Sequence, residues 1–203
     1  ALFATVPAEQ NYLADSYGLN SNILLGASDD GENFSFKNLL GYLRLAVVGE
    51  KRVDSIELMN NSGGAVAGLV ALKVTNVDFW QLYDSPSSSI TLNCGEGVQL
   101  SSSPVNFYFA MLPTMLEEGI SVNIHFTDGT SFIQNTNNAI TIERNAIQPM
   151  AVINTNIDES DYKRVLIHHT NRLFVTPLVE GYSNGSIDWG DGNISLLDEF
   201  SSY

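Results

Sequence analysis

The sequence contains a single cysteine, Cys94, among its 203 residues. A disulfide bond within the chain is therefore impossible, and so is a zinc site built from cysteines. Cys94 lies in the segment ITLNCGEG, where no neighbouring basic residue could stabilise a thiolate. We interpret it as a small buried hydrophobic residue near the end of a strand, and not as a reactive thiol.

Basic residues are also scarce, because 9 lysines and arginines stand against 23 aspartates and glutamates, giving a net charge of −14. Nucleic acids and anionic membrane surfaces are polyanions, so this charge argues against binding to either. It favours solubility outside the cell and is compatible with divalent cations. A hydrophobic content of 44% against 16% charged residues predicts a folded chain.

Long hydrophobic runs and targeting signals are missing as well. No apolar stretch is long enough to span a membrane, and the first residues do not read as a signal peptide. We therefore expect Ala1 to begin a processed or shortened chain.

The sequence gives little support for catalysis. It contains no glycine-rich phosphate loop. His168 and His169 would point to opposite faces of a strand, and His125 stands between two apolar residues. Carboxylates from distant strands could still form a glycosidase pair, but nothing in the sequence supports one. We predict that the protein is not an enzyme.

Period-two alternation dominates what is present. In Ser121–Phe126 every second residue is apolar, as in a strand with one buried face. Thr127–Thr130 contains Asp-Gly, which predicts a tight hairpin turn before a returning strand at Ser131. Further strands are expected at Leu2–Val6, Gly41–Val48, Val53–Met59, Asn106–Pro113, Ile140–Ile142 and Met150–Ile153.

Turn-forming residues separate these strands, which indicates an all-β sandwich. The expected turns are Ser28–Asn33, Asn60–Gly64, Asp84–Ser89 and Ser101–Pro104.

A polar, acidic segment, Asn154–Asp161, predicts a linker and a domain boundary. We assign 1–155 to a β-sandwich domain and 156–203 to a C-terminal β segment. The latter is too short to bury a good core alone, so it either packs on the first domain or opens a second, incomplete domain.

Five segments in a particular order carry a family resemblance: Phe36–Leu39 before a leucine-rich strand, Val53–Leu58, Tyr108–Pro113, Asp128–Phe132 and Ile140–Asn145. Together they resemble the fimbrillin-like surface proteins of Bacteroidetes. The resemblance covers the predicted sandwich domain, and it rests on the shared order of the segments because no single one is specific.

The resemblance implies a Greek-key, transthyretin-like β-sandwich that serves as a fimbrial (pilus) subunit or accessory adhesin at the cell surface, on the outer membrane. It implies assembly by β-strand donation, with other subunits or copies of itself as partners and no cofactor. Any membrane contact would be made by a lipid anchor outside this sequence. The exchangeable strand would be Leu2, Phe3, Ala4, Thr5 and Val6, although no arginine precedes it to mark a cleavage site, so whether the protein polymerises stays open.

The C-terminal segment contains Asp188-Trp189-Gly190-Asp191-Gly192, which is similar to the WGDG motif of Bacteroidetes surface proteins and of PKD-type modules. Physically it reads as a strand end followed by a tight turn. The alternative is a calcium site formed by Asp188, Asp191 and Asn193, since carboxylate and amide oxygens suit this ion. The spacing does not match an EF-hand loop.

A monomeric, lipid-anchored module that binds a glycan or a host protein is the alternative to a pilus subunit. Trp80 and Tyr83 lie beside a serine-rich segment and could stack on sugar rings. The same aromatic residues could instead pack at the edge of the sandwich.

Overall fold

The computed structural model describes residues 2–28, 30–73, 76–156, 186–188 and 194–196. Every regular element among these residues is a β-strand, which confirms the all-β prediction. The chain forms two compact units, Ala1–Asn156 and Ile157–Tyr203. In the second unit the described residues form an antiparallel pair, β16 (Ser186–Asp188) and β17 (Ile194–Leu196).

Two sheets form the sandwich in the first unit. The five-stranded sheet has the order β13 (Ser131–Thr136), β12 (Ile120–Phe126), β6 (Arg52–Asn60), β9 (Ser89–Gln99) and β2 (Glu9–Asn11). The three-stranded sheet has the order β10 (Val105–Met111), β5 (Gly41–Val48) and β15 (Ile147–Asn154). β2 and β15 join their sheets as parallel edge strands, and all other pairings are antiparallel.

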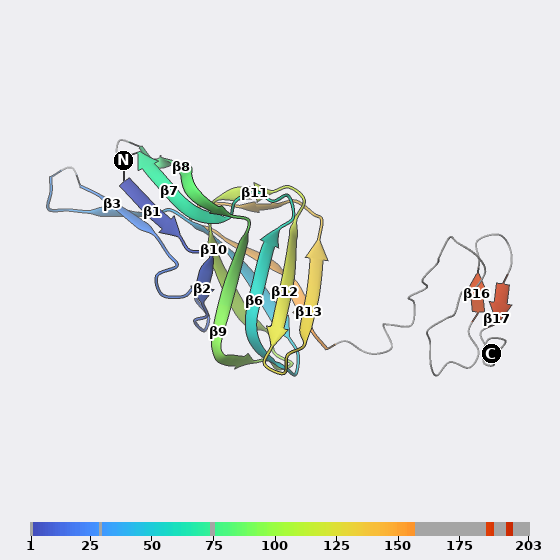
Figure 1. Ribbon diagram of the computed structural model, residues 1–203. Coiled ribbons are helices and arrows are strands. Elements are labelled where there is room, and N and C mark those ends of the chain that lie inside the picture. Colours follow the sequence, from blue (N-terminus) through green and yellow to red (C-terminus); the bar gives the residue numbers. More distant parts are fainter. Residues whose placement is uncertain (1, 29, 74–75, 157–185, 189–193, 197–203) are drawn as a thin grey trace. The chain divides into compact units, whose positions relative to one another are not determined.

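The connections follow a Greek key. β5 and β10 pair in one sheet while β6 and β9 pair in the other, so the chain crosses between the sheets twice and returns beside its starting strand. Figure 1 shows β9, β6, β12 and β13 side by side in the five-stranded sheet.

The remaining strands form smaller pairings around the sandwich. The small sheet has the order β1 (Leu2–Val6), β7 (Ala67–Lys73) and β8 (Asn76–Ser87), and it extends beyond one end of the sandwich in Figure 1. Two further pairs are β3 (Leu24–Ala27) with β4 (Ser35–Asn38), and β11 (Thr114–Leu116) with β14 (Ile140–Ile142).

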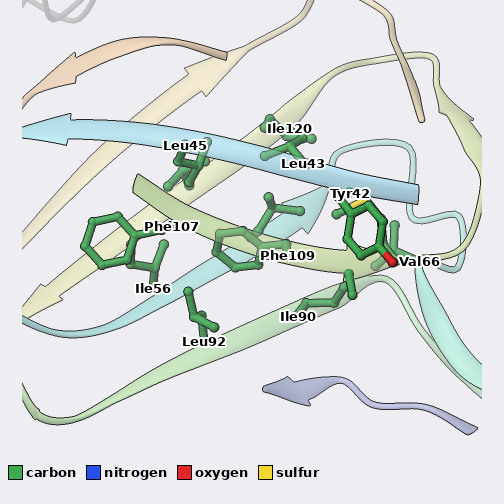
Figure 2. Packing of buried hydrophobic residues seen from close by; sticks show 14 of the residues in the cluster. Tyr42, Leu43, Leu45, Ile56, Val66, Ile90, Leu92, Phe107, Phe109 and Ile120 are labelled. Carbon is green, nitrogen blue, oxygen red and sulfur yellow. The ribbon is translucent and has the colours of Figure 1, made fainter. Parts of the chain in front are cut away.

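The core lies between the two sheets and follows from the alternation. In β12 every second residue from Ile120 to Phe126 is buried, and Ile56 and Leu92 lie on the same inner face. Phe107 and Phe109 of β10 face them from the three-stranded sheet (Figure 2). Burying such a side chain is worth about 1.5–3 kcal/mol, so this interface provides the main stabilisation of the fold.

β5 is buried on both faces. Leu43 lies in the core, whereas Tyr42 lies on the opposite face of the strand and is covered by the segment between β2 and β3. The ring of Tyr17 stacks on that of Tyr42 with centroids 4.7 Å apart. The Tyr42 hydroxyl donates to Asn22 Oδ1 at 2.6 Å and accepts from Asn38 Nδ2 at 2.7 Å. Burial raises the pKa of Tyr42 to about 12.

The predicted hairpin turn at Asp128-Gly129 is confirmed. Gly129 has a positive φ of 83°, which glycine adopts without strain. Asp128 Oδ1 accepts from the Thr130 amide at 3.0 Å and from its hydroxyl at 2.6 Å. These bonds and an ion pair with Lys51 at 3.0 Å lower the pKa of Asp128 to about 2.

Two details of the sequence interpretation are wrong. The segment Asp84–Ser89 is not a simple turn, because β8 continues to Ser87 through a bulge in which Ser85 has a φ of 51° and the register with β7 shifts. Cys94 does not end a strand but lies inside β9, where Gly95 and Gly97 take positive φ values at an irregularity opposite β6. Turn-forming residues mark bulges in both places. The prediction that Cys94 is buried is confirmed.

We expect Ile56→Ala to lower the free energy of unfolding by about 2–5 kcal/mol, because it leaves a cavity between the sheets. Ile133→Ala, at a position that is 62% exposed on β13, is the matched control and should change it by only about 0.5 kcal/mol. Chemical denaturation followed by circular dichroism measures both. Equal losses would contradict the assignment of the core.

Cys94 should not react in the folded protein. Burial, and secondarily the negative charge of Asp54, raises the pKa of its thiol to about 12, so the thiolate is not populated at pH 8. Titration with a disulfide reagent at pH 8 should therefore release no chromophore until guanidinium unfolds the chain. Rapid stoichiometric release from the native protein would contradict this.

Candidate functional site

The predicted exchangeable strand, β1, forms an edge of the small sheet. Among the described strands it pairs with β7 alone, from Leu2 opposite Leu72 to Val6 opposite Gly68. Val6 is buried, whereas Leu2 and Phe3 are 46% and 54% exposed. Backbone hydrogen bonds and one buried side chain therefore hold most of this strand in place.

The chain then crosses to the five-stranded sheet and forms its edge as well. β2 runs parallel to β9, with Gln10 opposite Leu92. The Thr91 amide donates to the Ala8 carbonyl at 2.7 Å, and the Tyr12 amide donates to the Asn93 carbonyl at 2.8 Å. Residues 2–12, here called the N-terminal segment, thus add an edge strand to two different sheets.

Gln10 connects this segment to β10, an edge strand of the three-stranded sheet. Its buried side chain lies against β10, where Nε2 donates to the Ala110 carbonyl at 2.6 Å and Oε1 accepts from the Ala110 amide at 3.0 Å. Nε2 also donates to the Pro7 carbonyl at 3.0 Å. The side-chain amide therefore replaces a backbone peptide group at the edge of the three-stranded sheet. Sequence reasoning missed Gln10, since a glutamine in a polar run carries no distinguishing signal.

The structure brings together two residues that were predicted for different roles. Phe3 of the exchangeable strand packs edge-on against Tyr83 of the proposed ligand site, with ring centroids 4.9 Å apart and an interplanar angle of 65°. Tyr83 is 66% exposed. We call this pair the aromatic patch. Its exposed rings can stack on a sugar or on an apolar side chain.

The other predicted ligand residue, Trp80, pairs through its backbone with Leu72 of β7. Its side chain lies outside the part that the structure describes, so a joint role for Trp80 and Tyr83 stays a prediction.

The calcium alternative also stays a prediction. Asp188 ends β16, while its side chain, Asp191 and Asn193 lie outside the described part. Within the described part, no three histidine, cysteine, aspartate or glutamate side chains are grouped so that they could hold a metal ion.

The histidines do not form a site with one another in the described part. His125 is half-buried on the outer face of the five-stranded sheet, opposite Ser55 and Ser131. His168 and His169 lie outside the described residues. Nothing that the structure describes forms an apolar helix of membrane-spanning length.

No family model matches this sequence, and no curated protein matches it either. Among solved structures the chain is similar to a candidate cell adhesion protein from Bacteroides fragilis, with 13% identity and a TM-score of 0.39 over 61% of this chain and 44% of that one. It is also similar to a candidate cell adhesion protein from Bacteroides uniformis, with 8% identity and a TM-score of 0.39 over 60% of this chain and 48% of that one. The chain therefore matches less than half the length of each of these proteins.

Gln10→Ala should loosen the N-terminal segment. It leaves the amide and carbonyl of Ala110 without their partner, and each buried group that loses its hydrogen bond costs roughly 1–3 kcal/mol. We expect lower stability in chemical denaturation and faster amide hydrogen exchange in residues 2–12. Asn11→Ala, at the exposed neighbouring position, is the control. Identical exchange in the two variants would show that Gln10 does not hold the segment.

Proposed function

We propose that this chain is a non-enzymatic adhesion protein of the cell surface, and that it assembles as a fimbrial subunit by exchanging its N-terminal segment for a strand of another subunit. The resemblance of its strand order to fimbrillin-like proteins supports this proposal. The observation that carries it is the position of residues 2–12 at the edges of two sheets.

The energetics of this segment suit exchange. Its buried side chains are Val6 and Gln10, and Ala4, Ala8 and Tyr12 pack partly buried against the core, so its departure removes only the edge of the core. It would, however, leave β7 and β9 without an edge partner and Ala110 without its side-chain amide. Unpaired strand edges beside an apolar groove favour the addition of another extended chain.

Cleavage in the connection after the segment would test the proposal. Leu19 is strongly exposed, so a site for a sequence-specific protease can be placed there in the full chain. After cleavage we expect multimers that survive unheated SDS electrophoresis and filaments in electron microscopy. A synthetic peptide of residues 1–12 should block them, whereas the same peptide with Val6→Asp should not, because Val6 must enter the core.

The uncut protein is the control for spontaneous association. If the cut protein stays a monomer, with or without its released segment, the exchange mechanism is wrong.

The second candidate is a monomeric, lipid-anchored binding module, and the exposure of the aromatic patch favours it. In this case the protein stays a monomer under all these conditions and binds a glycan or protein ligand through Phe3 and Tyr83. Tyr83→Ala would then abolish binding without changing stability, since this ring is largely exposed.

A further inference from the structure

Among the residues that the structure describes, no strand closes the side of the sandwich opposite β2. There the edge strand β13 of one sheet lies near the edge strand β15 of the other, and a groove of about 370 Å³ runs between them. Its floor consists of side chains that belong to the core, namely Leu45, Ile120, Val122, Ile140 and Ile153. Its volume lies within the roughly 300–1,000 Å³ that is typical of small-molecule sites.

The rim of this groove is polar but uncharged. Its polar lining residues are Gln134, Thr136, Asn138 and Asn154. Gln134 and Thr136 lie on the inner face of β13, opposite Val122 and Ile120. None of the residues that line the groove is charged, although the chain as a whole carries a net charge of −14. The lining therefore suits a neutral molecule that both donates and accepts hydrogen bonds.

The edges of the groove discourage an added β-strand. Pro149 of β15 has no amide hydrogen, its carbonyl already accepts from Gln148 Nε2 at 3.0 Å, and the register of β15 shifts between Pro149 and Val152. On β13 the carbonyl of Asn135 accepts from Gln134 Nε2 at 3.3 Å. Proline and register shifts of this kind protect edge strands from pairing. An occupant would therefore be held mainly by side chains.

We propose that this groove is a binding site for a neutral saccharide. A sugar ring has an edge of hydroxyl groups, which the rim amides can bind, and an apolar C–H face, which can lie on the aliphatic floor. The side chain of Asn138 is exposed and, within the described part of the chain, makes no hydrogen bond, so it is available to a ligand.

A second hollow of about 460 Å³ lies at the outer face of β12 and β13, where Ser121 pairs with Asn135. It is lined by amides, a hydroxyl group and two carboxylates, from Asn61, Asn135, Asn137, Ser121, Glu117 and Glu118. The proposal concerns the groove between the sheets and not this hollow. The inference goes beyond the proposed function, because strand exchange does not require a saccharide site and the site does not require assembly.

Titration calorimetry on the full chain tests this with neutral oligosaccharides built from glucose, mannose, galactose and N-acetylglucosamine, and with sialylated and sulfated counterparts. We expect a neutral oligosaccharide to bind. Gln134→Ala and Asn138→Ala should each weaken its binding about fivefold to tenfold, as the loss of one hydrogen bond does. Asn11→Ala, which removes an exposed amide outside the groove, should not change it.

Four results would overturn the assignment. In the first, no neutral oligosaccharide binds; in the second, the charged glycans bind more tightly than the neutral ones. In the third, Tyr83→Ala abolishes binding while the groove variants do not, which would move the site to the aromatic patch. In the fourth, an extended peptide of residues 1–8, and not a glycan, protects the amides of β13 and β15 from hydrogen exchange. Assembly is measured separately on unheated gels. A chain that binds a saccharide but stays monomeric would therefore contradict strand exchange and leave the saccharide site unaffected.

Discussion

Burial of alternating apolar side chains between two sheets is the interaction on which the rest of this structure depends. Because strand residues point to opposite faces in turn, β6, β9 and β12 each contribute a row of side chains to one layer, and β5 and β10 contribute the facing layer. This arrangement buries the apolar faces of the sheets, but it leaves the backbone groups at their edges without partners. A sandwich that does not close into a barrel must manage both open sides, and the candidate sites lie there.

The two open sides are managed in different ways. On one side β2 adds a parallel strand to β9, while Gln10 satisfies the edge of β10 with a side-chain amide. This closes the core with a segment that buries few side chains of its own. On the other side no described strand bridges β13 and β15, and the aliphatic floor stays accessible beneath an amide rim. Pro149 limits strand pairing there, so the two sides suit different partners.

Local features of the sequence account for what could be predicted. The bounds of β1, β5 and β14 follow from alternation, and the turn at Asp128-Gly129 follows from its own residues. The errors at Asp84–Ser89 and Cys94 have a common origin, because glycine, serine and proline permit bulges as readily as turns.

The parts of the candidate sites that depend on distant contacts could not be predicted. Gln10 contacts Ala110, which lies 100 positions away in the sequence, and a short polar run gives no indication of that contact. The pairing of Phe3 with Tyr83 likewise arises only when β1 and β8 flank β7. The rim amides lie in polar stretches that resemble ordinary surface loops. Only the fold shows that they border an accessible part of the core.

Strand exchange at one side and ligand binding at the other are physically compatible. The floor of the groove is built on β5, β12, β14 and β15, and none of these strands pairs with residues 2–12. Replacing the N-terminal segment would therefore leave the groove intact, and each subunit of an assembled fibre would present one copy of it. Linked copies of a weak site bind a multivalent surface far more tightly than a single copy does. Assembly would thus convert modest affinity for a saccharide into firm attachment, which a monomer with the same groove could not achieve.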